Sequence, residues 1–224
     1  MVFKRRNRRS VLQVLREFLW PRGGWARAAT YVTHRLRRLP DDPHRIARGV
    51  FAGVFVSFTP FFGLHWILAG LIAWATRGNI LAALLATFAG NPLTTPLVAW
   101  SSVELGHWIL GDPVGMSLRE ILDAFSSAGA ELWANFQAIF TPHVTHWQRL
   151  GHFFRSIFLP YLVGGGMPGL VVSLGFYYAT IPIVRGYQKL REVKLKERIE
   201  RVRAAKAARA EADRRAMQRK VDQT

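Results

Sequence analysis

The chain has 224 residues, no cysteine and a formal net charge of +17. Lys and Arg outnumber Asp and Glu by 13 to 3 in residues 1–48 and by 14 to 6 in residues 185–224, but the ratio is 4 to 5 in residues 49–184. The missing cysteines exclude disulfides, thiolate metal sites and thiol nucleophiles, and the near-neutral centre offers no basic surface to a nucleic acid. The charges divide the chain into a basic amphipathic N-terminal region, a central domain and a charged C-terminal helix, at residues 1–43, 44–184 and 185–224.

Residues 4–39 have the pattern of basic amphipathic helices. "WPRGGW" at residues 20–25 breaks the pattern, and a second helix is expected from about Ala26 to a point before "LPDDPH". These helices are predicted to anchor at the membrane surface, and a solvated basic arm is the alternative. Asp42 followed by Pro43 predicts an N-cap with proline at the first helical position, so that a further helix begins there and enters the membrane.

Three uncharged runs follow, at residues 49–76, 78–103 and 156–184. Each is longer than the roughly 18–20 apolar residues that indicate a bilayer span. The fold class predicted is therefore an all-α integral membrane protein that crosses the membrane more than once. Because Lys and Arg flank the apolar runs on both sides, both termini are expected in the cytoplasm, which requires an even number of complete crossings. Anionic lipids of the inner leaflet would hold these flanks electrostatically.

Each run contains proline and glycine near its centre, in "TPFFG" at 59–63, "NPLTTP" at 91–96 and "GGGMPG" at 164–169. An unbroken helix of such a length is too long for one upright span and too short for two spans with a turn. Two interpretations fit: a re-entrant hairpin of two half-helices, or one long, kinked and tilted helix. We favour hairpins for the first two runs. For the third run, two interpretations of "GGGMPG" stay open: a third break, or close helix packing.

Residues 112–155 are moderately polar, and their apolar side chains share helical faces. They are predicted to form interfacial helix rather than a span. From residue 185 the sequence is rich in Lys, Arg and Glu and predicts a long solvent-exposed helix.

Non-helical backbone at membrane depth must be buried in protein or must line a polar cavity. Two consecutive breaks could face each other, and the N-termini of half-helices present free N–H groups that suit an anion or a phosphate. Asn91, Thr94 and Thr95 have an alternative, structural role, because they could satisfy backbone groups that the neighbouring prolines leave unpaired. The candidate ligand-binding residues are Pro60, Gly63, His65, Arg77, Asn79, Asn91, Pro92, Thr94, Thr95 and Glu104.

Glu104 and His107 lie one helical turn apart and form the only plausible acid–base pair for a membrane enzyme. A single carboxylate–x–x–His pair is not enough for a di-metal site. The sequence has no nucleophile elbow, P-loop or dinucleotide fingerprint. We therefore expect no catalytic activity, no cofactor and no metal.

Three short motifs carry a family resemblance: G-x-F-x-x-F-x-P-x-x-G from Gly53 to Gly63, R-x-N from Arg77 to Asn79, and N-P-x-T from Asn91 to Thr94. Over about residues 44–112, with a weaker match in "LPYLVGGGMPGLVVSLG", the sequence resembles the bacterial DUF2062 family of small membrane proteins of unknown function. The resemblance implies a place in the bacterial inner membrane. Relatives are sometimes fused to glycosyltransferase-like domains, which implies work near lipid-linked envelope intermediates. The resemblance supplies no substrate and no catalytic residue.

Two functional hypotheses follow. In the first, the paired breaks bind or move a small anion or a lipid head group. In the second, the protein is a scaffold of the cell envelope that acts through its basic termini. The expected partners are anionic membrane lipids and, through the termini, other proteins. No specific nucleic acid is expected, and homo-oligomerisation is left open.

Overall fold

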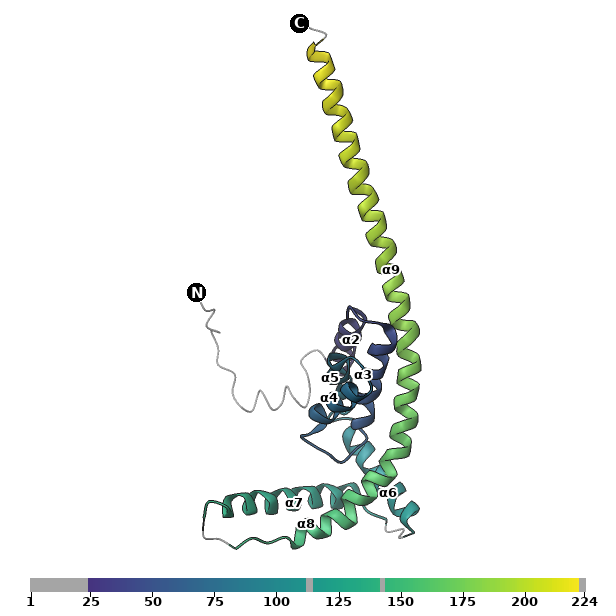
Figure 1. Cartoon of the computed structure of the whole chain (residues 1–224). Helices are drawn as coiled ribbons and strands as arrows, with labels where there is room; N and C mark the ends of the chain where they lie inside the picture. Colours follow the sequence, from purple (N-terminus) through teal and green to yellow (C-terminus); the bar gives the residue numbers. More distant parts are fainter. Residues whose placement is uncertain (1–23, 112–114, 142–143, 222–224) are drawn as a thin grey trace. The chain divides into compact units, whose positions relative to one another are not determined.

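The computed structural model describes residues 24–111, 115–141 and 144–221, with the side chains of Trp25 and of residues 207–221 left out. Helices are the regular secondary structure of these described residues (Figure 1), which confirms the predicted all-α class. The chain divides into two compact units, residues 1–181 and 182–224, which are described separately. The division expected from the charges, at residues 43/44 and 184/185, stays a prediction.

Helices α2 (Gly24–Arg37) and α3 (Pro43–Val56) begin the described chain. The position of α2 agrees with the helix expected from about Ala26. Oδ1 of Asp42 accepts hydrogen bonds from the backbone N–H groups of His44 at 2.8 Å and Arg45 at 3.3 Å, which confirms the predicted N-cap. The first predicted amphipathic helix and most of "WPRGGW" lie outside the described residues.

The first two predicted breaks are present. An irregular segment, residues 57–64, separates α3 from α4 (His65–Ala75). In the second run, α5 (Ile80–Ala86) continues into the 3-10 helix η1 (Thr87–Ala89), and residues 90–94 separate η1 from α6 (Thr95–Leu110).

A third break is absent, which settles the alternative left open for residues 164–169. Helix α9 (Leu159–Val221) passes through "GGGMPG" without interruption. The glycines allow close packing instead, because a side chain at Gly164 would collide with the carbonyl oxygen of Ser102 on α6. The helix is irregular before α9 begins: α8 (Gln148–Phe153) leads into the π-helical segment η2 (Phe154–Phe158).

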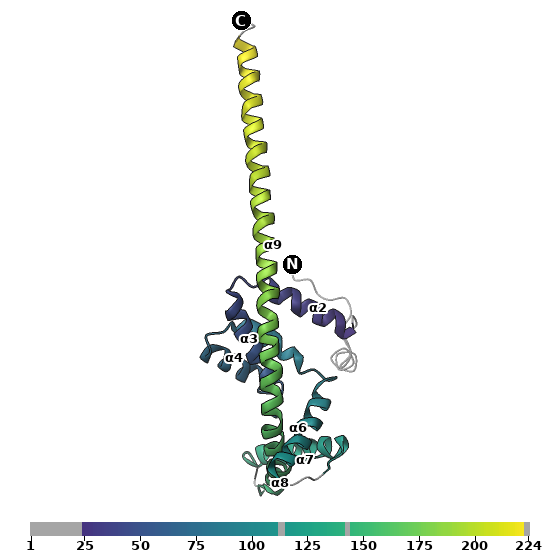
Figure 2. The same cartoon turned by 90° about the vertical axis from the view of Figure 1, so that its right-hand side faces the viewer.

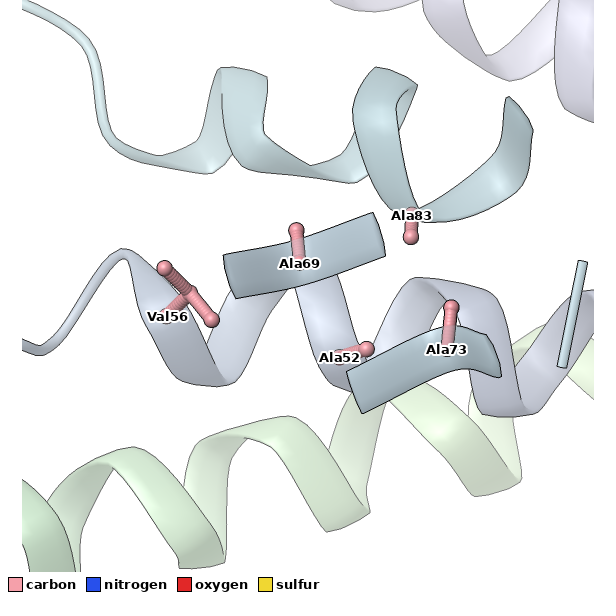
Figure 3. Close-up of a cluster of buried hydrophobic side chains, with 5 residues drawn as sticks. All are labelled: Ala52, Val56, Ala69, Ala73 and Ala83. Atoms are coloured by element: carbon pink, nitrogen blue, oxygen red, sulfur yellow. The ribbon is translucent and has the colours of Figure 1, made fainter. Parts of the chain in front are cut away.

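Helices α3, α4 and α5 pack into one cluster through small side chains (Figure 3). Its buried members are Ala52, Val56, Ala69, Ala73 and Ala83. Glycines bring α3 and α5 into backbone contact: a Cβ on Gly49 or Gly53 would collide with a carbonyl oxygen at Asn79 or Ala83. Such small-residue interfaces are typical of helix pairs in membranes.

Helices α3 and α5 run in the same direction. Helix α4, which connects them in the sequence, runs in the opposite direction and packs against both. At the N-terminal ends of the two helices, the backbone N–H of Asn79 donates to the carbonyl of Arg45 at 2.8 Å. At their C-terminal ends, the hydroxyl of Ser57 lies 3.4 Å from the carbonyl oxygen of Thr87. Both predicted breaks therefore lie at the same end of this cluster.

A second cluster joins α6, η2 and α9 to α7 (Leu118–Ala138), and its buried members are Ala99, Val103, Ile121, Ile157 and Tyr161. Helix α9 contacts α3 and the first residues after it along the segment from Gly165 to Tyr177, through His44, Phe55 and Phe58. It contacts α6 with its preceding segment, down to Pro160. Helices α3 and α6 therefore follow one another along α9, as both views show (Figures 1 and 2).

Among the described residues, the segment Gln148–Lys206 is long and apolar enough to cross a membrane. His65–Ala75 and Ile80–Ala89 are shorter apolar helices. The breaks explain the difference from the three runs in the sequence, because they divide the first two runs into helices that are each shorter than a span.

The second unit, residues 182–224, contains the later part of α9. Its described side chains are mainly exposed, including those of Leu190, Val193, Ile199 and Val202. This agrees with the solvent-exposed helix expected from the charges.

Candidate functional site

The first break folds its polar groups back onto its own backbone. The hydroxyl of Thr59 donates to the carbonyl of Val56 at 2.7 Å, and the ring Nε2 of His65 lies 3.2 Å from the carbonyl oxygen of Thr59. Pro60 is buried. Gly63 has a φ of 84°, a left-handed conformation that glycine adopts without strain, and it lies two residues before the start of α4.

The second break is a compact turn held by two side chains. Oδ1 of Asn91 accepts the backbone N–H groups of Leu93 at 2.9 Å and Thr94 at 3.1 Å. The hydroxyl of Thr94 donates to the carbonyl of Ala89 at 2.6 Å and accepts the N–H of Asn91 at 3.1 Å. These bonds correspond to the structural role foreseen for Asn91 and Thr94. Ligand binding by their side chains stays a prediction.

Pro92 and Thr95 complete this turn without side-chain hydrogen bonds of their own among the described contacts. The backbone N–H of Thr95 donates to the carbonyl of Asn91 at 2.8 Å, and α6 begins at Thr95. Both residues are half-buried. Their contribution is to direct the chain from η1 into α6.

The two breaks meet. The hydroxyl of Ser57 is placed between the carbonyl oxygens of Gly53, at 3.0 Å, and Thr87, at 3.4 Å. A Cβ added to Gly90 would lie 3.0 Å from the Cβ of Ser57. Gly165 of α9 packs directly against the carbonyl of Phe58. Three backbone segments thus converge at one place in the first unit. We call this place, formed by Ser57, Phe58, Thr87, Gly90 and Gly165, the junction of the breaks.

Two helices begin at this junction, α4 and α6, and neither has a side-chain hydrogen bond capping its first turn. Uncapped first turns leave N–H groups without helical partners and carry the positive end of the helix dipole. In α6 the N–H of Thr95 is bonded to the carbonyl of Asn91 and Pro96 has no N–H, so α4 supplies most of the free N–H groups. Together the two helix starts favour a negatively charged or strongly accepting group.

Arg77 and Asn79 lie elsewhere, in the turn between α4 and α5 at the opposite end of the cluster. Arg77 adopts a φ of 53°, unusual for a residue with a side chain, and its carbonyl accepts a hydrogen bond from Nη2 of Arg48 at 3.1 Å. Asn79 caps α5 by accepting the N–H of Ala82 at 2.7 Å. The predicted residues therefore form two groups, one at the breaks and one at this turn.

Glu104 and His107 each have a separate structural partner. Oε1 of Glu104 accepts the backbone N–H of Met116 at 2.7 Å, which joins α6 to the segment before α7. Nε2 of His107 lies 2.9 Å from the carbonyl oxygen of Ser156 in the π-helical turn. Within the described residues, no group of three potential metal ligands among His, Asp and Glu is present.

Two polar residues of α7 that the sequence analysis did not single out hold the region before and within α8. Asn135 exchanges hydrogen bonds with the backbone of His146, donating with its Nδ2 and accepting at 2.9 Å. The buried carboxylate of Glu131 accepts the N–H groups of Arg149 and Leu150. The sequence contains a pattern that could have indicated these two residues: Glu131 and Asn135 are spaced by four residues and interrupt an otherwise apolar helical face.

The comparisons with known proteins agree with the motifs and extend the region that they cover. The DUF2062 family model, described as an uncharacterized protein conserved in bacteria, matches residues 26–192. This range adds α2, α7, α8 and much of α9 to the region around the breaks. No curated protein and no solved structure matches the chain. Since the family model covers most of the sequence, the chain belongs to the DUF2062 family.

Proposed function

We propose that this protein is an integral protein of the bacterial inner membrane in which α3 and α4 form a re-entrant hairpin. At 1.5 Å per residue, the 14 residues of α3 and the 11 of α4 are about 21 and 16 Å long. Both fall short of a hydrocarbon core of roughly 30 Å. A hairpin of such helices enters from the side of Arg45 and Arg48, turns at the first break near the bilayer centre, and returns to Arg77.

The second run crosses instead of returning. Helix α6 follows α3 along α9 in the direction away from the N-terminus of α3, so that α5, η1 and α6 continue through the membrane. Together their 7, 3 and 16 residues measure about 39 Å, enough for one interrupted crossing. Helix α9 supplies the return crossing. Two crossings and one hairpin leave both termini in the cytoplasm, as the positive flanks require.

The junction of the two breaks is the proposed site, and it binds or moves a small anion or the head group of an anionic lipid. The observation that carries this proposal is the contact of Ser57 with Thr87 and Gly90, which joins two helix breaks at one depth. Discontinuous helices whose first turns point at a ligand are a recurrent way to build such a site. Here the backbone N–H groups of the first turn of α4 and the N–H of Leu97 in α6 are the donors, rather than the amide of Asn91, because the N–H of Thr95 is bonded to Asn91 and Pro96 has none.

Cysteine accessibility tests the membrane topology in this naturally cysteine-free chain. Single cysteines at Phe62, Gly78, Thr95 and Gly111 are labelled with a membrane-impermeant maleimide, in spheroplasts and in inverted vesicles. Gly78 should label from the cytoplasmic side and Gly111 from the opposite side, whereas Phe62 and Thr95 should react slowly from both. Labelling of Gly78 and Gly111 from one side would show that the second run is also a hairpin.

The Asn91→Asp variant tests whether an anionic ligand binds at the junction. The aspartate keeps the Oδ acceptor that holds the turn, but it adds a negative charge at the start of α6, where an anion would bind. In purified full-length protein, binding of short-chain phosphatidylglycerol should weaken at least tenfold. Gln137→Glu, which adds the same charge to an exposed position on α7, is the control. Equal binding by both variants and the wild type would remove the site from the junction.

A scaffold that acts through its termini is the second candidate. It is favoured by the continuation of α9 as an exposed helix rich in Lys and Arg beyond residue 185. If the protein is such a scaffold, variants that lack residues 1–40 or 190–224 should not complement a strain deleted for this protein. The Pro60→Ala and Asn91→Asp variants should complement it. The opposite pattern supports the junction.

The proposed function includes no catalysis. The separate engagement of Glu104 with Met116 and of His107 with Ser156 supports this part of the proposal. Full complementation by a folded Glu104→Gln, His107→Ala double variant would agree with it, and loss of complementation at unchanged stability would contradict it.

A further inference from the structure

An open groove of about 260 Å³ lies between α7 and α8, in a part of the first unit that has no role in the proposed function. Four of its lining side chains can form hydrogen bonds, and two are apolar. The lining residues are Ala124, Ser127, Gln148, Arg149, His152 and Phe153.

The groove has positive charge and no acidic lining residue to balance it. Among the described residues, no carboxylate lies within ion-pair distance of the Arg149 guanidinium, and the nearby carboxylate of Glu131 is buried and engaged by the backbone N–H groups of Arg149 and Leu150. Asp123 of α7 lies 3.9 Å from Arg119. A guanidinium without a counter-ion in a concave surface favours an anionic ligand.

The donors of the groove suit a phosphate group. Arg149 offers a planar fork of N–H donors that binds two phosphate oxygens at once. Gln148 adds a side-chain amide, and the ring of His152 adds a nitrogen, since its Nδ1 lies 3.4 Å from the hydroxyl of Ser156 while Nε2 has no partner among the described contacts. Several donors on two successive turns can address the oxygens of one phosphate group.

The apolar surroundings indicate that this phosphate is attached to a lipid. Ala124 and Phe153 form an apolar wall of the groove. The outward face of α7 exposes Trp133 and Phe136, at 61% and 51%, and Phe140, just after the end of α7, is 75% exposed. Exposed aromatic side chains on an amphipathic helix are typical of a helix that lies in the interface between head groups and acyl chains. A ligand in the groove would therefore have its phosphate at Arg149 and its apolar part against Ala124 and Phe153, on a helix that lies in this interface.

The groove is held in shape before any ligand arrives. Glu131 fixes the first turn of α8, and Asn135 fixes the backbone of His146 just ahead of it. These bonds set the position of Gln148 and Arg149 relative to α7. A preformed site lowers the entropy lost on binding.

From this juxtaposition we infer that the α7–α8 groove is a second binding site, specific for the phosphate group of a lipid. It is independent of the junction of the breaks. The chemistry alone also fits free phosphate, and the experiment distinguishes the two sources.

Purified, delipidated full-length protein is titrated with dihexanoyl phosphatidic acid and with inorganic phosphate, and binding is followed by native mass spectrometry and calorimetry. The lipid should bind at least tenfold more tightly than inorganic phosphate. Arg149→Gln should weaken lipid binding at least tenfold. Arg155→Gln, an equal loss of charge on the adjacent η2 segment outside the groove, should change it less than twofold.

Equal weakening by Arg149→Gln and Arg155→Gln would overturn the site, because it would indicate general attraction to positive charge. Equal affinity for inorganic phosphate and for the lipid would overturn the lipid attachment. Helix content and thermal unfolding verify that Arg149→Gln is folded, and Gln148→Ala supplies a second groove variant that should also weaken binding. The same titrations are repeated in the Asn91→Asp background, where binding at the junction is weakened. The effect of Arg149→Gln should persist there, which separates failure at the groove from failure at the junction.

Discussion

The side-chain amide of Asn79 donates a hydrogen bond to Oδ2 of Asp41 at 3.0 Å, while its Oδ1 accepts the N–H of Ala82 at 2.7 Å. One side chain therefore caps α5 and ties it to the segment that precedes α3. The backbone N–H of Asn79 adds a third bond, to the carbonyl of Arg45 at 2.8 Å. The described polar atoms of Asn79 join three parts of the α3–α5 cluster, and ligand binding by Asn79 stays a prediction.

Asn79→Ala should lower the free energy of unfolding by about 1–3 kcal/mol, because it removes a helix cap and a hydrogen bond to a carboxylate. Asn79→Ser should lose less, since the serine hydroxyl can still cap α5 but cannot reach Asp41. Thermal unfolding in detergent micelles measures both. Unchanged stability of Asn79→Ala would contradict a structural role for Asn79.

Gly49 and Gly70 provide a matched pair for the packing of α3 on α5. Gly49→Ala should destabilise the protein by about 1–3 kcal/mol or more, because its new methyl group would collide with the backbone at Asn79. Gly70 lies inside α4, where a new methyl group would meet its nearest neighbour, the side chain of Ile80, only at 3.9 Å. Gly70→Ala should therefore be neutral or stabilising by up to about 1 kcal/mol. Equal effects would show that α3 and α5 do not touch in this way.

Asn91 separates a structural turn from a ligand contact. Asn91→Ala removes the acceptor for two backbone N–H groups and should cost about 1–2 kcal/mol in unfolding free energy. Asn91→Asp keeps that acceptor but replaces Nδ2, which lies 3.4 and 3.5 Å from the carbonyl oxygens of Phe88 and Ala89, with a carboxylate oxygen that these carbonyls repel. Because the side chain can turn slightly away, the cost should be smaller than that of Asn91→Ala, about 0.5–1 kcal/mol. A loss of stability in Asn91→Asp as large as in Asn91→Ala would show that the amide donor also holds the turn.

Local signals in the sequence predicted the helix ends well. Asp42 before Pro43 determines the start of α3, and proline with glycine or asparagine produced irregular backbone at residues 57–64 and 90–94. The same composition failed at residues 164–169. There the glycines face α6 and α3, and close packing of three helices stabilises a continuous α9.

The candidate site was harder to predict because it depends on contacts between distant residues. Arg77 and Asn79 follow the first run in sequence as closely as the breaks do, but α4 returns and places them at the other end of the cluster. The meeting of Ser57 with Thr87 and Gly90 depends on the parallel packing of α3 and α5, which Gly49 and Gly53 permit. No local pattern contains this register.

The first turn of α7 should lose stability in acid. Ser117 and Glu120 form a capping box, in which the carboxylate accepts the backbone N–H of Ser117 at 2.7 Å and its hydroxyl at 2.8 Å. These two bonds, the backbone one first, lower the pKa of Glu120 below its usual value, because they favour the ionised form.

A pKa that is lower in the folded state contributes stability above the unfolded pKa of about 4.3, and the contribution is lost as the pH falls through the folded value. Hydrogen exchange of the amides of residues 117–121, measured from pH 7 to pH 3 and corrected for intrinsic rates, should therefore show weakening protection below about pH 4.3. Glu120→Gln cannot ionise and should abolish this pH dependence while it keeps part of the cap. Asp123→Asn, in the next turn, should preserve it because Asp123 is not part of the box. An identical pH profile in wild type and Glu120→Gln would show that another group controls the end of the helix.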